Sequence, residues 1–341
     1  MCRTTLPAML AAAAMLAPAC GPAIAAGTCQ VGILAELAVD NPASHRVITH
    51  GEINGQPARI LIDTGAAYSV LWRTSVPALG LKPLDSNSQK LYGIGGESKV
   101  QYAHLDELKI SHFVTRNISF PVSGDRPMGF DLLLGEDVLS RYTLEFDLGH
   151  QTVRLLTHKD CRPEQLAYWA KTYALVTLAA TPRAGGMIQP LLKLNGREIR
   201  AELDSGAGYT VVSTVFAKNA GAVDVVDAGK TFGLGKDTLE LQIGTFNTIA
   251  VGDELVNHAT IELAELNHNV RREETGSRIA AQKDYLPEML LGTDFLLSHR
   301  VVIPEDAKQM MFTYEGGPVF QHRPRATATP APETPPAREG E

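Results

Sequence analysis

Two aspartates of this sequence stand in nearly the same surroundings. Asp63 ends an apolar run and opens a glycine turn in ARILIDTGAAYSVL, and Asp204 does the same in IRAELDSGAGYTVV. A carboxylate can take a proton from water while a carboxylic acid gives one to a carbonyl oxygen. Two carboxyl groups that meet can therefore activate water for amide hydrolysis. An ordinary turn aspartate before glycine is the alternative interpretation.

Each aspartate belongs to one copy of a longer internal repeat. An Asn-Gly turn typical of a β-hairpin precedes each aspartate, and a Gly-rich stretch and an apolar Leu-Leu-Gly segment follow it. The matched segments are Asn54-Gly55 and Asn195-Gly196, LYGIGGES (91–98) and TFGLGKDT (231–238), and LLLGEDVL (132–139) and MLLGTDFL (289–296). Alternating apolar and polar residues predict two mostly β copies, with one short helix after each Leu-Leu-Gly segment. Asp137 and Asp294 are then helix-start residues rather than catalytic groups.

This order of motifs resembles the retropepsin-like aspartic proteases. Their signature is an apolar strand into Asp-Thr/Ser-Gly-Ala, a Gly-rich flap, and an apolar pair with glycine before a short helix. The sequence carries this signature twice, over residues 35–157 and 173–315. The resemblance implies an all-β fold of two retropepsin- or pepsin-like acid-protease lobes related by a pseudo-twofold axis. It also implies that Asp63 and Asp204 are the catalytic residues and hold one water between them.

The same resemblance assigns roles to the neighbours of the aspartates. Hydroxyl groups suit hydrogen bonds across the pair, and glycine lets backbone N–H groups approach a carboxylate. Two flap tips would add main-chain hydrogen bonds to an extended peptide. The loop-bracing residues are Thr64, Gly65, Ser205 and Gly206, and the flap residues that bind substrate are Gly93, Ile94, Gly95, Gly233, Leu234 and Gly235.

One pair of equivalent positions departs from the repeat. The residue two before each aspartate lies on the same face of its strand, and it is Leu61 in the first copy but Glu202 in the second. The resemblance implies that this position lines a substrate pocket. A third carboxyl group there either selects a basic side chain of the substrate, or raises the pKa values of the aspartate pair and hampers catalysis.

Composition and charge exclude several other classes of function. The chain has 341 residues, a net charge of −7 and no Lys/Arg-rich block, so we do not expect nucleic acid as a partner. The glycine clusters lack the G-x-G-x-x-G spacing of dinucleotide sites, and the ten histidines show no zinc-binding spacing. We therefore expect neither a cofactor nor a metal.

The ends of the chain and the segment between the copies set the expected domain boundaries. Residues 1–26 join Arg3 to an apolar run and an Ala-Ile-Ala cleavage pattern, which predicts a signal peptide rather than a transmembrane segment. The expected segments that follow are a first lobe at 27–156, a helical connector at 157–172 and a second lobe at 173–322, which contains a polar insertion at 267–285. A disordered Pro-rich tail is expected at 323–341.

A signal peptide implies export, to the periplasm or the medium, and it changes what the cysteines mean. Cys29 and Cys161 would be the two thiols left after cleavage, and in an oxidising compartment we expect them to form a disulfide. Two unpaired thiols are the alternative. A lipoprotein acylated at Cys20 is the alternative to simple export.

The sequence therefore predicts an exported aspartic endopeptidase that acts on a peptide or protein substrate as a monomer. Two alternatives stay open. The cleft could bind peptides without useful hydrolysis, as a scaffolding protein of the cell envelope. Copies from different chains could also pair with each other in a domain-swapped dimer.

Overall fold

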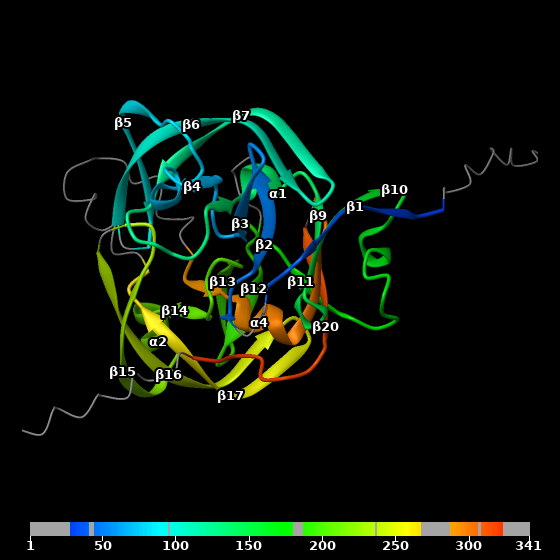
Figure 1. The fold of residues 1–341 in the computed structure, drawn as a ribbon. Helices are drawn as coiled ribbons and strands as arrows, with labels where there is room; N and C mark the ends of the chain where they lie inside the picture. Colours follow the sequence, from blue (N-terminus) through cyan, green and yellow to red (C-terminus); the bar gives the residue numbers. More distant parts are fainter. Residues whose placement is uncertain are drawn as a thin grey trace, which may run out of the picture.

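A computed structural model gives the fold of residues 28–40, 44–94, 96–179, 187–235, 237–266, 287–305 and 308–322. These residues form two β lobes with a further sheet between them (Figure 1), so the all-β prediction is confirmed. The predicted signal peptide, Gly95, the insertion at 267–285 and the tail at 323–341 lie outside the described residues and stay predictions. Within the described part, no helix is long and apolar enough to cross a membrane.

The first lobe is a closed barrel. Its elements are β2 (Ile48–Ile53), β3 (Gln56–Ile62), β4 (Val70–Trp72), β5 (Leu84–Gly93), β6 (Gly96–Ile110), β7 (Phe113–Ser123), β8 (Leu132–Leu134) and α1 (Glu136–Leu139). The hydrogen-bonded order β2-β3-β8-β4-β7-β6 closes on itself because β6 also pairs with β2, while β5 pairs with β6 outside the ring. Closure removes the free strand edges of an open sheet and encloses apolar side chains such as Ile60, Leu71 and Leu132.

The second lobe repeats this plan strand for strand. Its elements are β12 (Leu191–Leu194), β13 (Arg197–Leu203), β14 (Val211–Ser213), α2 (Thr214–Asn219), β15 (Val223–Phe232), β16 (Thr238–Val251), β17 (Glu254–Ala264), β18 (Met289–Leu291) and α4 (Thr293–Ser298). The order β12-β13-β18-β14-β17-β16 closes through the pairing of β12 with β16, and β15 lies outside the ring. The duplication read from the sequence is therefore a duplication of barrels.

Both Asn-Gly turns predicted from the sequence are confirmed. They join β2 to β3 and β12 to β13, and φ is 49° at Asn54 and 76° at Gly55, against 49° and 78° at Asn195 and Gly196. Positive φ at both central residues fits the twist of a two-residue hairpin, and asparagine and glycine tolerate it best. The short helices predicted after each Leu-Leu-Gly segment are also present, as α1 and α4.

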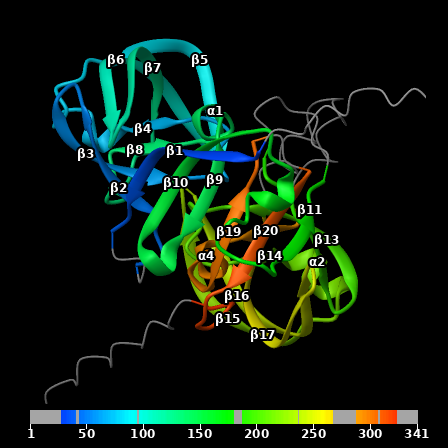
Figure 2. The same ribbon diagram turned by 90° about the vertical axis from the view of Figure 1, so that its right-hand side faces the viewer.

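A third sheet joins the lobes, and the sequence did not predict it. Its strands are β1 (Gln30–Ala38), β10 (Thr152–Lys159), β9 (Thr143–Asp147), β19 (His299–Ile303), β20 (Gln309–Tyr314) and β11 (Ala174–Thr177), in that order. Strands β9 and β19 come from different copies of the repeat and pair along Arg300 to Ile303. Figure 2 shows β19 and β20 beside β9 and β10 between the two lobes. Backbone hydrogen bonds therefore hold the halves together.

The predicted helical connector at 157–172 is wrong. Residues up to Lys159 belong to β10, and the only helical piece in the segment is a 3-10 turn at Pro163–Gln165. The segment instead packs on the shared sheet, where Leu166 and Ala167 are buried against Val302 and Met311. Tertiary packing of the apolar residues thus overrides the helix propensity of CRPEQLAYWAKTY.

The predicted disulfide is confirmed. Cys29, just before β1, is bonded to Cys161, just after β10. These strands pair from Gln30 opposite Lys159 onward, so the disulfide closes the open end of a strand pair at the edge of the shared sheet. In the chain-entropy model, a cross-link that closes so long a loop lowers the entropy of the unfolded state by an amount worth about 5 kcal/mol.

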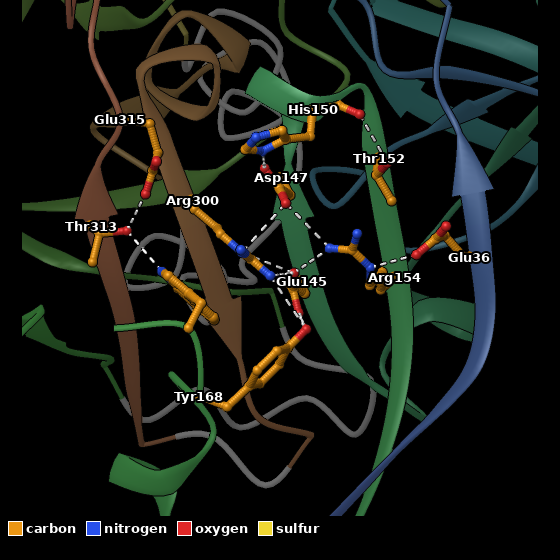
Figure 3. A network of polar contacts seen from close by, with 11 residues as sticks. Glu36, Glu145, Asp147, His150, Thr152, Arg154, Tyr168, Arg300, Thr313 and Glu315 are labelled. Atoms are coloured by element: carbon orange, nitrogen blue, oxygen red, sulfur yellow. Dashed lines mark hydrogen bonds and ion pairs between the residues drawn. The ribbon is translucent and has the colours of Figure 1, made fainter. Parts of the chain in front are cut away.

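A buried polar network lies on the shared sheet where the lobes meet (Figure 3). Glu145 of β9 has a fully buried side chain and accepts hydrogen bonds from Arg154 (2.6 Å), Arg300 (2.7 and 3.0 Å) and the Tyr168 hydroxyl (2.7 Å). The Arg300 guanidinium also lies 4.4 Å from the ring centre of Trp169, at cation–π distance. Residues from both lobes and from the connector thus share one buried carboxylate.

We predict that Arg300→Leu lowers the free energy of unfolding by roughly 3 kcal/mol, because removing one partner leaves a buried charge with less compensation. Urea unfolding followed by circular dichroism measures this loss. The matched control is Arg116→Leu, which breaks an exposed ion pair with Glu107 and should cost no more than about 1 kcal/mol. Equal losses in the two variants would contradict the assignment of Glu145 as the centre of the lobe junction.

Candidate active site

The two aspartates stand at equivalent strand ends in the two lobes. Asp63 directly follows β3, and Asp204 directly follows β13. Each backbone N–H donates to the Leu-Leu-Gly strand beside it, Asp63 to the Leu134 carbonyl (3.0 Å) and Asp204 to the Leu291 carbonyl (2.9 Å). The parallel pairing of β3 with β8 and of β13 with β18 thus fixes where each aspartate leaves its barrel.

The aspartate loops of the two lobes cross each other closely. A Cβ added to Gly65 would lie 2.4 Å from Cγ of Asp204, and one added to Gly206 would lie 2.4 Å from Cγ of Asp63. Each glycine therefore packs its bare Cα against the carboxyl group of the opposite lobe. The two carboxyl groups also share a hydrogen bond. The structure thus brings Asp63 and Asp204 together, at a place where any side chain on either glycine would force them apart.

Hydroxyl groups on the next residues tie the crossing together. The Thr64 hydroxyl donates to the Leu203 carbonyl (2.6 Å), and the Ser205 hydroxyl donates to the Ile62 carbonyl (2.8 Å). Each hydroxyl oxygen also accepts the backbone N–H of the other residue, at 3.0 and 3.1 Å. Both side chains are fully buried, so these four hydrogen bonds form without competition from water.

Burial and mutual charge set the protonation of the aspartate pair. Burial raises the pKa of Asp63 well above its ordinary value, and the neighbouring Asp204 charge raises it further. Burial also raises the pKa of Asp204, but N–H groups of Ala207 and Gly206, each 2.9 Å from one carboxylate oxygen, offset part of that rise. Two like charges in contact cannot both persist, so the pair holds one proton.

Among the residues that the structure describes, no three His, Cys, Asp or Glu side chains lie close enough together to hold a metal ion. Two carboxyl groups that share one proton, one charged and one neutral, can act as general base and general acid.

Comparisons with known proteins bear on both lobes. Residues 49–141 match a family described as "gag-polyprotein putative aspartyl protease", and residues 191–295 match one described as "Aspartyl protease". Each match contains one of the two aspartate loops. The chain carries two retropepsin-like aspartyl protease domains in tandem.

Solved structures of similar proteins are each about the size of one lobe. A retropepsin-like aspartic protease from Rickettsia conorii is 20% identical, with 38% of this chain and 95% of that chain covered and a TM-score of 0.29. EIAV protease, solved in complex with an inhibitor, is 26% identical, with 28% of this chain and 86% of that chain covered and a TM-score of 0.24. None of the curated proteins compared matches the chain.

In each aspartyl protease domain a second pair of polar residues braces the aspartate loop. Asp137 accepts hydrogen bonds from the Ser69 backbone N–H (2.9 Å) and hydroxyl (2.7 Å), and Asp294 accepts the same two from Thr210 (3.0 and 2.7 Å). Asp137 and Asp294 lie in the first turns of α1 and α4, as predicted. Their contact with the aspartate loop was missed, although the matched Ser69 and Thr210 of the repeat carried the signal.

The flap tips of the two domains touch each other. The Gly235 N–H donates to the Ile94 carbonyl (3.1 Å). Gly93 packs on Leu234, so closely that a Cβ added to Gly93 would lie 3.2 Å from the Leu234 Cβ. Gly233 approaches Ile94 more closely still. The predicted flap residues of the described chain therefore meet at one place, although they are 140 residues apart in the sequence.

The barrel faces beside the aspartates differ in polarity. In the first domain Leu61 packs with Ile48, Trp72 and Phe130, and Leu234 of the opposite flap packs against this cluster. In the second domain Glu202 lies in one row across the sheet with Leu290, Val211 and Glu262, because β13, β18, β14 and β17 pair in that register. Both glutamate side chains are buried, with relative exposures of 3% and 1%. One face is apolar and the other acidic.

A further buried glutamate lies under the first aspartate loop. Glu136 begins α1, its N–H donates to the Ala66 carbonyl (2.8 Å), and the residue is 1% exposed. Its Oε1 is buried without a hydrogen-bond partner. Burial, with a smaller contribution from the Asp137 charge, raises the pKa of Glu136 to about 8. The equivalent Thr293 instead donates its hydroxyl to the Ser205 carbonyl (3.0 Å).

We predict that Glu136→Gln changes how stability depends on pH. Between the ordinary pKa of 4.5 and the folded value of about 8, the folded protein holds a proton that the unfolded chain has lost. Stability therefore falls as pH rises through this range, and an uncharged glutamine should remove a loss of a few kcal/mol at pH 9. Urea unfolding at pH 5 and pH 9 measures the effect.

The control for this prediction is Glu164→Gln, at an exposed glutamate of the connector. Its stability should follow that of the parent protein at both pH values. A Glu136→Gln variant that gains nothing at pH 9 relative to pH 5 would show that the Glu136 carboxyl group titrates near its ordinary pKa.

Proposed function

We propose that the chain is an aspartic endopeptidase that hydrolyses peptide bonds with water activated by Asp63 and Asp204. The observation that carries the proposal is the reciprocal contact at the loop crossing. Gly65 packs on the Asp204 carboxyl group, Gly206 packs on the Asp63 carboxyl group, and the two carboxyl groups share a hydrogen bond. A pair of acids held face to face by both lobes can serve as acid and base in the same step.

The two pKa shifts suggest how the roles divide. Asp204 accepts two backbone N–H groups on one oxygen, which favours its charged form, and it is the base that takes a proton from the attacking water. Asp63, whose pKa lies well above its ordinary value, donates its proton to the carbonyl oxygen of the substrate. The proton taken by Asp204 then goes to the leaving amine as the C–N bond breaks, and Asp63 takes a proton back from a hydroxyl group of the tetrahedral intermediate, which becomes the carboxylic acid product. The pair thereby returns to its single-proton state.

The flaps and the barrel faces indicate which kind of peptide the chain would bind. Hairpin tips that lie together can donate main-chain hydrogen bonds to an extended peptide, as an added strand would. The face around Leu61 is apolar, and the face around Glu202 carries carboxyl groups. We therefore propose a peptide with an apolar side chain on one side of the cleaved bond and a basic side chain on the other.

We predict that Asp63→Asn lowers kcat/KM for peptide cleavage by at least about a thousand-fold, because an amide cannot supply the proton. A quenched-fluorescent peptide library detects the cleavage, and the melting temperature checks that the fold persists. The control is Asp106→Asn, at an exposed position on β6, which should retain full activity. The parent enzyme should show a bell-shaped pH profile whose basic limb lies above the ordinary pKa of aspartate. Turnover retained in the Asp63→Asn variant would exclude this mechanism.

We predict that Glu202→Leu reduces the preference for Lys or Arg beside the cleaved bond, because leucine makes the second face apolar like the first. Cleavage-site mapping by mass spectrometry measures the preference, and Glu202→Gln tests whether charge alone decides it. If Glu202 instead hampers catalysis through the pKa values of the aspartate pair, both variants should raise kcat for every substrate and shift the pH profile. An unchanged cleavage profile in both would reject the pocket assignment.

A peptide-binding protein without turnover is the second candidate function. The buried Glu202 and Glu262 motivate it, since a carboxylate close to the aspartate pair would oppose the charged form that the base must adopt. Incubation of a peptide library with the protein across acidic and neutral pH separates the candidates. Saturable binding without new peptide termini would favour the scaffold over the protease.

A further inference from the structure

In the first lobe an internal arginine ties the flap to the barrel. Arg73 directly follows β4, and its guanidinium donates to the Asp125 carboxylate (3.1 Å), the Gln101 side chain (2.6 Å) and the Lys99 carbonyl. Gln101 and Lys99 lie on β6, which continues to the flap tip, whereas Asp125 lies in the loop after β7. The side chain therefore bridges the flap arm and the barrel body.

The second lobe keeps one part of the surroundings of this arginine, a glutamine bonded to an aspartate, but not the arginine itself. Thr214 directly follows β14 and holds the place of Arg73. Gln242 stands opposite Leu263 as Gln101 stands opposite Val122, so the two glutamines are equivalent. Each glutamine amide also donates to an aspartate on the outer flap strand. Gln101 donates to Asp85 at 2.8 Å and Gln242 donates to Asp227 at 3.4 Å.

An acidic hollow of about 430 Å³ lies beside Thr214 and Gln242, which are equivalent to Arg73 and Gln101 of the first lobe. Thr214, Asp227, Glu240, Gln242 and Glu265 are among its lining residues. Glu240 replaces the cationic Lys99 of the first lobe, and Glu265 accepts a hydrogen bond from Thr214 (3.4 Å) on the side where Asp125 binds Arg73. The ammonium group of Lys230 pairs with Glu240 at 2.6 Å, and both of these side chains are largely exposed. Three residues with carboxyl groups and one glutamine are thus among those that line the hollow.

We propose that this hollow binds the arginine side chain of a peptide or protein partner. A planar guanidinium donates in a fixed fork to carboxylate and amide oxygens, and the first lobe shows the same kind of pocket filled by such a group. A bound arginine joins β16 to the barrel body, as Arg73 joins β6. The site therefore couples partner binding to the second flap. The proposal concerns a site outside the aspartate crossing and holds whether or not the chain cleaves peptides.

Binding of Nα-acetyl-arginine amide to the full chain, followed by isothermal titration calorimetry, tests the proposal. We expect saturable binding at the hollow, and at least about tenfold weaker binding there of the citrulline analogue, which keeps the shape but loses the charge. Thr214→Arg supplies an internal guanidinium from the position that Arg73 occupies in the first lobe, so it should abolish the binding. Undiminished binding in Thr214→Arg, or equal affinity for the citrulline analogue, would overturn the proposal.

Matched variants distinguish the hollow from other acidic surfaces. Asp227→Asn and Glu265→Gln should each weaken the binding by several-fold, whereas Asp85→Asn, at the equivalent aspartate of the first lobe, should not change it. Glu202→Leu should remove only arginine that binds on the barrel face beside the aspartate pair and should leave binding at the hollow in place, because Glu202 does not line the hollow. Binding that is lost in Glu202→Leu and kept in Asp227→Asn would place the arginine at the candidate active site and refute the second site.

Discussion

The structure depends on the crossing of two loops that leaves no room for a side chain. Gly65 and Gly206 each place a bare Cα against the carboxyl group of the opposite lobe, and Thr64 and Ser205 bond to backbone groups across the same crossing. A methyl group at either glycine would overlap a carboxyl group, so the contact requires glycine at both positions. It also fixes the distance between the two halves. The barrels, the shared sheet and the flaps must all be placed so that the two loops can cross at this distance.

Two features hold the halves in that position at some distance from the crossing. The shared sheet pairs β9 of the first copy with β19 of the second, and the buried Glu145 binds arginines from both. Because both copies belong to one chain, the association carries no concentration dependence, unlike that of a homodimer. The disulfide between Cys29 and Cys161 closes the edge of the same sheet. The junction is thus stabilised by backbone pairing, by charge and by a covalent bond.

A single chain also permits the two copies to differ, and the differences lie at matched positions. On the barrel faces, Leu61 of the first copy corresponds to Glu202 of the second. At the base of the flaps, Arg73 corresponds to Thr214. At the start of the helix after each Leu-Leu-Gly segment, a buried glutamate in one copy corresponds to a hydrogen-bonded threonine in the other. The backbone has kept its twofold plan while the side chains have diverged. A substrate or partner therefore meets two different surfaces on either side of one symmetric crossing.

The sequence by itself determined the duplication, the hairpins at Asn54 and Asn195, the short helices and the cysteine pair, because each depends on local backbone chemistry or on matched spacing. It also singled out Asp63 and Asp204, through the glycine turns that follow them. Only the tertiary structure decided that the segment after β10 packs as an irregular connector, that Glu145 collects two arginines, and that the place of Arg73 is an acidic hollow in the second lobe. These features arise from residues far apart in the chain, whose contacts depend on how closed barrels and a shared sheet pack together, and no local pattern records that.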